Sequence, residues 1–340
     1  MEDKLYKICI CPVKNEAWII ERFIKATSLW ADYIILADQN SSDATVEIAK
    51  AHSNVIVINN PGNYNEFERT KLLINEARKI GQRRLILALD ADEFLSANYM
   101  ESPEWQSLIS MPPGNLGMIE RVNISPETMN LNYFAPLQMI VALMDDNSAS
   151  IENTSQSNIH NIRLPWPPGA KVLNLREVKV LHLDFVDYNR TKSKNRWYQC
   201  FEMLKNNLSP TELRDKYQLP YSVKDFLKTV TLTPINNSWI EGYQKLNIDL
   251  TSNIILGSYW WDEDVYNWIA EHGTSKFKLA NIWEVNWVNK AKEKAHSKPD
   301  SFQLNRSIMD KAIFYLLYRK TAFTKTKIGG LVTRTLLFLS

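Results

Sequence analysis

The chain has 340 residues, of which 45% are hydrophobic and 23% charged, and its 40 Lys and Arg nearly balance its 38 Asp and Glu to give a net charge of +2. This length can bury one large core or two ordinary ones, and the balanced charge argues against a nucleic-acid partner. Three cysteines (Cys9, Cys11 and Cys200) are too few for a disulfide framework, and no run reaches the roughly 18 apolar residues that span a bilayer. The N-terminus shows no secretory signal, so we expect a cytoplasmic protein.

The first ninety residues alternate between two hydrophobic periodicities. Short continuous apolar runs predict strands buried on both faces, at 6–11, 33–37, 54–58 and 84–89. Between them, segments with helical spacing predict helices at 16–30, 44–53 and 66–80. The repeated strand, helix, strand order implies right-handed crossovers, and therefore a parallel sheet with helices on both faces.

The periodicity weakens after residue 95. Further strands are expected at 116–124, 136–144 and 178–185, with a polar loop around 147–158. Ser209, Pro210 and Glu212 predict a helix start, because they supply an N-cap, a proline at the first position and a capping box. The region from about residue 225 is rich in Trp and Tyr, and we expect a mostly helical C-terminal part. These features divide the chain into a catalytic domain at 1–205 and an acceptor or association region at 206–340.

The last thirty residues are basic and amphipathic. Residues 311–340 contain six Lys or Arg and no acid, interleaved with apolar runs. This pattern is typical of a segment in peripheral contact with a membrane, here at its inner face. A helix packed on the body of the protein explains the same pattern.

Polar residues follow each of the first four predicted strands, at 12–16, 38–43, 59–66 and 90–93. In an open parallel sheet those strand ends share one edge, where ligands bind. The last segment, DADE, places Asp90, Asp92 and Glu93 close together, so the carboxylates either lie in water or hold a cation. Mg²⁺ or Mn²⁺ together with a nucleoside diphosphate suits such a site. The ten glycines form neither a G-x-G-x-x-G motif nor a Walker loop, which disfavours dinucleotide enzymes and P-loop proteins.

Four segments, in this order and spacing, resemble the family 2 glycosyltransferases of the GT-A fold: CPVKNEAWIIERFI, YIILADQNSSDAT, NEFERTKLLINEARKI and LILALDADEFL. The resemblance covers about residues 6–96 well and continues more weakly to about residue 205. It implies an α/β fold of the GT-A (Rossmann-like) type, with a parallel-core sheet flanked by helices. It also implies a nucleoside-diphosphate sugar as donor and Mn²⁺ or Mg²⁺ as cofactor.

The resemblance also implies roles for individual residues. The sugar-nucleotide pocket would be lined by Pro12, Asn15, Glu16 and Asp38. Arg69 matches a basic position near the diphosphate, although a solvated helix face explains it equally well, and Asp43 matches a second acid or caps the next helix. Asp90 and Asp92 match the family's D-x-D metal motif, with Asp90 also facing the donor. Glu93 is expected either to support these two ligands or to lie on the acceptor side. RLPWPPGAKVLNLREVKVLHLDF resembles the family's late segment, so His182 would be a third metal or diphosphate contact, or else a satisfied core residue.

An inverting transfer requires a carboxylate that takes the proton of the acceptor hydroxyl. The family's usual late acidic motif is not recognisable here. Asp184 is the first candidate, because it lies two residues after His182 and side chains at that spacing on a strand share a face. Asp145, Asp146 and Glu177 are further candidates.

Two other interpretations fit parts of the sequence. The chain is a non-catalytic sugar-nucleotide-binding module if the missing base motif means lost activity. A haloacid-dehalogenase-like phosphotransferase also has D-x-D after a strand, but it carries a Thr where this chain has Phe94. The acceptor is expected to be a glycan or a lipid-linked glycan, as in surface or envelope glycan synthesis, if the basic tail contacts a membrane.

Overall fold

The computed structural model describes all residues except 1–3, 63, 127–130, 151–161, 251–257 and 319–340. The chain forms two compact units. The first combines Met1–Asp187 with Val230–Ile255, and the second combines Tyr188–Thr229 with Leu256–Ser340. Each unit is therefore built from two stretches of sequence, and a functional division at residue 205 stays a prediction.

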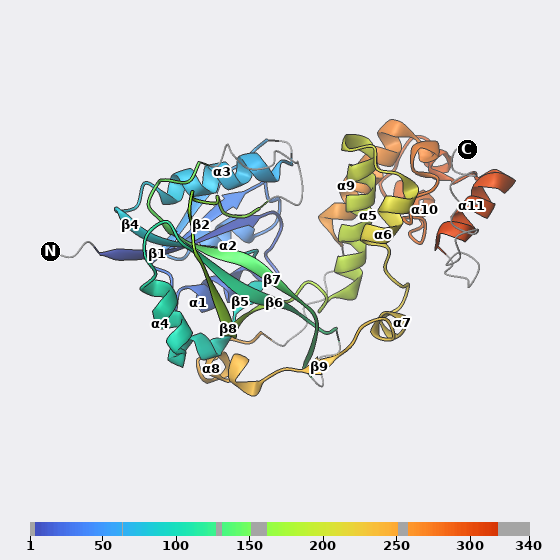
Figure 1. The fold of residues 1–340 in the computed structure, drawn as a ribbon. Helices are drawn as coiled ribbons and strands as arrows, with labels where there is room; N and C mark the ends of the chain where they lie inside the picture. Colours follow the sequence, from blue (N-terminus) through green and yellow to red (C-terminus); the bar gives the residue numbers. More distant parts are fainter. Residues whose placement is uncertain (1–3, 63, 127–130, 151–161, 251–257, 319–340) are drawn as a thin grey trace. The chain divides into compact units, whose positions relative to one another are not determined.

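The first unit is organised around a nine-stranded sheet in the order β3-β2-β1-β4-β7-β6-β8-β5, with β9 paired to β7 (Figure 1). Strands β3, β2, β1 and β4 are mutually parallel, whereas β7 joins β4 in antiparallel direction. The sheet thus has the predicted parallel core, and it is extended by a mixed half. The strands are β1 (Leu5–Val13), β2 (Tyr33–Asp38), β3 (Val55–Asn59), β4 (Arg83–Ala88), β5 (Glu93–Leu95), β6 (Leu116–Ile124), β7 (Asn132–Asp145), β8 (Val172–His182) and β9 (Thr233–Pro234).

Helices flank the sheet as the alternating periodicity predicts. Figure 1 shows α3 on one face and α1 on the other. Apolar residues of α3 such as Phe67 and Ile74 pack with Ile8 and Ile10 of β1 in one buried cluster. The helices of this unit are α1 (Ile20–Thr27), α2 (Thr45–Lys50), α3 (Glu66–Ala77), α4 (Pro103–Ile109) and α8 (Glu241–Lys245), with short 3-10 turns η1 (Ala97–Glu101) and η3 (Asn237–Trp239).

The predicted strands and helices of the first ninety residues are confirmed, with differences at their ends. Helix α1 starts at Ile20, because the amides of Ile19 and Ile20 both donate to the carbonyl of Glu16 and form a turn first. Strand β8 ends at His182, so the prediction of a strand through residue 185 is wrong there. A turn follows, closed by a hydrogen bond from the Val186 amide to the Leu183 carbonyl.

The described part of the second unit is helical and aromatic-rich, as predicted. Ser209 caps α6 through a capping box with Glu212, which confirms that helix start. Helices α5 and α9 pack through aromatic contacts, including Trp197 on Trp260 and Trp268. The helices are α5 (Tyr188–Lys205), α6 (Pro210–Tyr217), α7 (Val223–Leu227), α9 (Trp260–His272), α10 (Trp287–Glu293) and α11 (Ile308–Tyr318), with 3-10 turns η4 (Thr274–Phe277) and η5 (Pro299–Phe302).

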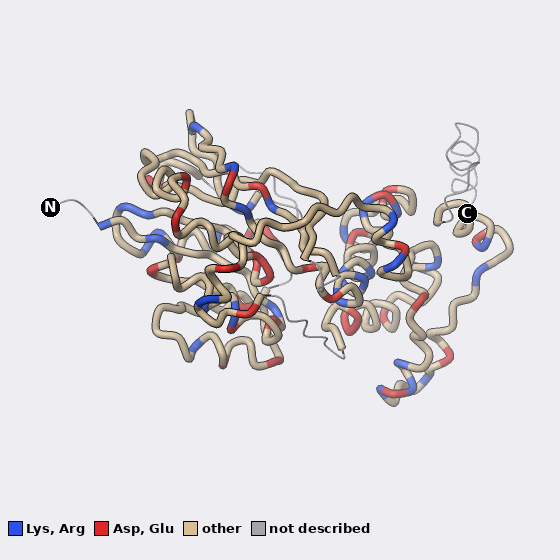
Figure 2. The backbone as a smooth tube through the Cα atoms, turned by 90° about the horizontal axis from the view of Figure 1, so that it is seen from below, with Lys and Arg blue, Asp and Glu red and all other residues tan. Residues whose placement is uncertain are grey.

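Within the residues that the structure describes, none of the helices has the length and apolar character to cross a bilayer. Most of the basic tail, residues 319–340, lies outside the described residues. Figure 2 shows Lys and Arg mixed with Asp and Glu along the described chain, as the balanced composition leads one to expect.

A buried ion-pair cluster fixes the junction of the parallel and antiparallel halves of the sheet. The Asp145 side chain is fully buried and accepts from Arg84, 1% exposed, at 3.0 Å and from Arg78 at 2.8 Å. Asp145 and Arg84 are direct cross-strand partners of β7 and β4. The cluster therefore satisfies a buried charge at the start of β4, away from the end that leads to Asp90.

Replacing Asp145 by Asn is expected to lower the free energy of unfolding by about 3 kcal/mol, because it leaves a buried guanidinium without its counter-charge. Urea denaturation of the variant measures this loss. Glu76→Gln removes a partner of the exposed Lys79 and serves as control, with an expected change under about 1 kcal/mol. Equal effects of the two substitutions would contradict the structural role of Asp145.

Candidate functional site

The carboxyl ends of the parallel strands lie along one edge of the sheet. Val13 pairs with Asp38, and Asp38 pairs in turn with Asn59 on the next strand. Strand β4 runs parallel beside β1, and Asp90 follows two residues after its last residue, Ala88. The polar segments predicted to meet at one edge are therefore neighbours.

The loops after β1 and β2 are joined by hydrogen bonds. Asn15, whose φ of 55° lies in the left-handed region, accepts from the Ser42 amide at 2.7 Å and donates its own amide to Ser41. Asp43 accepts from the Ala17 amide at 3.1 Å, so it links the two loops as well as turning the chain into α2.

The four residues predicted to line the nucleotide pocket occur in this hydrogen-bonded edge: Pro12, Asn15, Glu16 and Asp38. Asp38 is 8% exposed and accepts from the amide of Ser41. Glu16 accepts from the indole of Trp18 at 2.7 Å. The structure thus brings these residues together, and their contact with a nucleotide stays a prediction.

Arg69 is a half-buried residue of α3 rather than a fully solvated one. Its guanidinium lies over the ring of Tyr64, 5.3 Å from the centroid. Burial acts to lower its pKa, but the surrounding Tyr64, Glu66 and Asp90 raise it, so the group keeps its charge. Arg69 therefore directs a positive charge toward the DADE segment.

Three neighbouring strands place a polar row beside that segment. Glu93 of β5 is opposite His182 of β8, and His182 is opposite Asn123 of β6. The ring of His182 donates from Nδ1 to Asn123 Oδ1 at 2.7 Å. This bond leaves Nε2 with its lone pair, and Nε2 lies 3.6 Å from Oδ1 of Asp92.

Asp92 and His182 form a pair of electron donors that suits a divalent cation. Burial lowers the pKa of His182, although Asp92, Asp184 and Glu93 act to raise it, and this favours the neutral ring that a metal requires. Two ligands of a Mg²⁺ ion at about 2.1 Å lie about 3 Å apart, so only a small approach of the two side chains is needed. The Asn123 contact is the kind of supporting bond that metal-binding histidines make.

Asp90, the third predicted ligand, has a cationic partner of its own. Its Oδ2 lies 2.5 Å from Nη2 of Arg163. Partial burial, aided by Glu93 and Asp92 and opposed by Arg163, raises the pKa of Asp90 to about 6. In the described part of the chain no three His, Cys, Asp or Glu side chains are gathered to hold an ion. Asp92 and His182 are the two predicted ligands that face each other, and the metal role of Asp90, Asp92 and His182 stays a prediction.

Glu93 is the buried member of the acidic segment, with no exposed surface. It forms ion pairs with Arg163 and, at 3.4 Å, with Arg121 of β6, and it accepts from the Asp90 amide at 3.0 Å. Burial acts to raise the pKa of Glu93, but Arg163, His182 and Arg121 hold it well below its usual range. Glu93 thus stays ionised and is bonded to its neighbours, and its role in the reaction stays a prediction.

Arg121 and Asn123 are site residues that the sequence did not single out, and Arg163 was noted only as the arginine that opens the segment RLPWPPGAKVLNLREVKVLHLDF. Arg121 and Asn123 are two residues apart on the strand 116–124, whose other residues are apolar or Gly apart from Glu120, and that spacing places both on one face. Two polar residues on one face of a largely apolar strand indicate that this face lines a polar site. Arg163 lies in an irregular segment, and nothing in its local sequence indicates its partners.

The candidate bases fall in different places. Asp184 is 4% exposed and lies in the turn after β8, so the inference that it shares a strand face with His182 is wrong. Its charge nevertheless acts on His182, which places it beside the pair. Asp145, at the end of β7, and the adjacent Asp146 lie beside the start of β4, at the end of the sheet opposite to the site. Glu177 is exposed.

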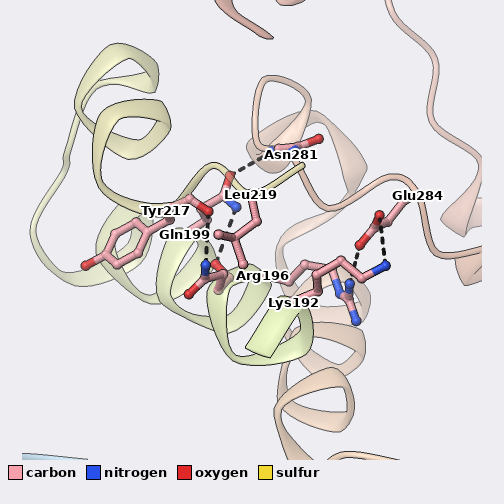
Figure 3. A pocket seen from close by; sticks show the side chains of 8 residues that line it. Lys192, Arg196, Gln199, Tyr217, Leu219, Asn281 and Glu284 are labelled. Carbon is pink, nitrogen blue, oxygen red and sulfur yellow. Dashed lines mark hydrogen bonds and ion pairs between the residues drawn. The ribbon is translucent and has the colours of Figure 1, made fainter. Parts of the chain in front are cut away.

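The second unit contains a small polar pocket formed by α5, the end of α6 and residues near 281 (Figure 3). Its volume of about 10 Å³ holds one water molecule at most. Arg196 and Lys192 both turn toward Glu284, as Figure 3 shows, and Arg196 also binds Asp262 of α9. The pocket is therefore part of the packing of this unit.

Comparison with known proteins places the sheet edge in a family. Residues 8–102 match the sequence profile of Glycosyl transferase family 2, a stretch that runs from β1 through Asp90, Asp92 and Glu93. The resemblance to this family is therefore confirmed over residues 8–102. Because the same segment matches, the haloacid-dehalogenase-like alternative is set aside. A search of curated proteins found no match.

Solved structures resemble the chain more distantly. Glucosyl-3-phosphoglycerate synthase from Mycobacterium tuberculosis, solved with Mn²⁺, UDP and phosphoglyceric acid, is 20% identical over 35% of this chain and 43% of its own, with a TM-score of 0.27. TarS 1-349 from S. aureus is 12% identical over 87% of this chain and 89% of its own, with a TM-score of 0.36. The matched part spans less than half of the synthase, and at such TM-scores neither likeness carries an argument about this chain.

Replacing Glu93 by Ala is expected to lower the free energy of unfolding by about 3 kcal/mol, because two arginines lose their buried partner. Asp90→Ala is the matched control. The Asp90 side chain is 40% exposed and its loss leaves Arg163 paired with Glu93, so about 1 kcal/mol or less is expected. Thermal or urea denaturation of both variants measures the difference, and similar values for the two would contradict the supporting role of Glu93.

Proposed function

We propose that this protein is a glycosyltransferase that moves a sugar from a nucleoside-diphosphate sugar to an acceptor hydroxyl, with inversion and with Mn²⁺ or Mg²⁺ as cofactor. The observation that carries the proposal is the approach of Asp92 Oδ1 and His182 Nε2 to 3.6 Å at the ligand-binding edge of a family 2 segment. A carboxylate and a neutral imidazole nitrogen facing each other are suited to a cation between them.

Different residues of this sheet edge would bind the cation, the nucleotide and the phosphates. Asp92 and His182, together with Asp90 once it is released from Arg163, would hold the divalent cation, which supplies stabilisation of negative charge on the leaving diphosphate. Asn123 fixes the ring of His182 through its bond to Nδ1. Pro12, Asn15, Glu16 and Asp38 line the nucleotide side, and Arg69 presents its guanidinium to the phosphates.

Asp184 is the proposed general base. The acceptor oxygen forms a bond to the anomeric carbon while the bond from that carbon to the diphosphate oxygen breaks, and Asp184 takes the hydroxyl proton. Its support is its position, buried in the turn that follows His182. Its charge also acts on His182, so the carboxylate is beside the proposed cation site.

The acceptor and the cellular setting are also proposals. A glycan or lipid-linked acceptor, surface or envelope glycan synthesis, and cytoplasmic work at the inner face of a membrane all follow from the basic tail. Residues 319–340 of that tail lie outside the described residues. Co-sedimentation of the full chain with anionic vesicles, compared with a chain ending at Tyr318, tests the membrane contact.

Titration calorimetry of UDP, GDP and their sugar conjugates with and without Mn²⁺ tests the donor site. Metal-dependent binding of one nucleotide is expected, weakened by about 100-fold or more in Asp92→Ala. Asp146→Asn, an acid at the opposite end of the sheet, is the matched control and should bind as wild type does. Absence of nucleotide binding under all conditions would overturn the proposed function.

Asp184→Asn is expected to reduce turnover of the sugar nucleotide by about 100-fold or more, with donor affinity unchanged, because only proton removal is lost. Asp187→Asn alters another buried acid three residues further on and controls for local disturbance. Turnover within a few-fold of wild type would exclude Asp184 as the base. Binding of the donor by wild type without turnover would favour the non-catalytic module.

A further inference from the structure

Arg163 holds two carboxylates of the site at once. Its Nη2 lies 2.5 Å from Asp90 Oδ2 and 3.1 Å from Glu93 Oε1, and its Nη1 also contacts Glu93. The next residue, Leu164, is 3% exposed and belongs to the buried cluster that contains β1 and β4 residues. Leu164 thereby anchors the backbone beside the site, and the long side chain of Arg163 extends from it to Asp90 and Glu93.

The contact with Asp90 differs from the contact with Glu93. Glu93 has no exposed surface and has Arg121 as a second partner, so its pairing is structural. The Asp90 side chain is 40% exposed and faces the edge where the donor is proposed to bind. An exposed carboxylate can exchange its partner at lower cost than a buried one. Of the two ion pairs of Arg163, the pair with Asp90 is therefore broken more easily than the pair with Glu93.

Arginines offset most of the negative charge of the site without any metal ion. Asp90, Asp92, Glu93 and the neighbouring Asp184 supply four negative charges, and Arg69, Arg121 and Arg163 supply three positive charges. A divalent cation added alone therefore places excess positive charge next to guanidinium groups. A cation that arrives with a diphosphate restores the balance, because the phosphates neutralise both the ion and a displaced arginine.

We propose that Arg163 competes with the divalent cation for Asp90, so that the ion binds weakly alone and tightly together with the nucleoside diphosphate. The identity of the diphosphate rests on the proposed function, whereas the competition for Asp90 rests on the contacts of Arg163. Arg163 is in this sense a positioning residue, because it acts on the ion through Asp90. Without ligands, the guanidinium of Arg163 is paired with Asp90. When the cation and the diphosphate are bound together, the cation takes the place of that guanidinium.

The first experiment measures Mn²⁺ binding without nucleotide, by electron paramagnetic resonance of the free ion. Arg163→Gln is expected to bind Mn²⁺ about 10-fold more tightly than wild type, because Asp90 is released. Arg121→Gln removes the same charge from the same cluster without touching Asp90, and a smaller gain is expected. Equal gains would mean a general charge effect and would overturn the competition.

A second variant controls for the change in local net charge, and thermal denaturation checks its folding because it also alters the buried Glu93. Arg163→Gln combined with Glu93→Gln removes one positive and one negative charge, leaving the local net charge unchanged. The side-chain amide oxygen introduced by Glu93→Gln can still accept from the backbone amide of Asp90. This double variant is also expected to bind Mn²⁺ more tightly than wild type. Wild-type affinity in both variants would overturn the proposal.

The same titrations with UDP separate this inference from the proposed function. In wild type, UDP is expected to increase Mn²⁺ affinity by a larger factor than in Arg163→Gln, because only wild type must displace the guanidinium. If wild type binds UDP with Mn²⁺ and Arg163→Gln shows the same factor, the competition fails and the proposed function stands. If Arg163→Gln gains Mn²⁺ affinity while neither protein binds any nucleotide, the proposed function fails and the competition stands.

Discussion

The fully buried carboxylate of Glu93 is the constraint on which the candidate site depends. A buried charge must be paired, and Glu93 is paired by arginines from two segments distant in sequence, at residues 121 and 163. Its second oxygen also accepts the Asp90 amide, which fixes the turn between β4 and β5. The exposed carboxylate of Asp90 and the donor pair of Asp92 and His182 are held in place around this one group.

Strand register does the rest of the positioning. Glu93, His182 and Asn123 are direct partners across β5, β8 and β6, and successive side chains of a strand point to opposite faces. A slip of one residue in either pairing would turn His182 away from Asp92. The mixed half of the sheet, which brings these three strands together, is thus as important for the site as the parallel core that defines the fold class.

Much of the architecture was predictable because its signals are local. Continuous apolar runs and helical spacing are properties of short stretches, and they predicted β1 to β4 and the helices between them. Ser209 and Glu212 predicted a helix start because a capping box closes within three residues. The prediction failed where the end of an element depends on a distant partner: β8 stops at His182, where the Leu183 amide instead donates to the carbonyl of Asp92.

The sequence by itself determined the four-motif edge, including Asp90, Asp92 and Glu93, because strand order and the residues after each strand are both written in the chain. Only the tertiary structure decided which charges meet there. Arg163 is 70 residues from Glu93 in sequence, and their contact depends on how an irregular segment is anchored by Leu164 in the core. Electrostatic pairing depends on distance in space, and that distance is set by packing that no local pattern records.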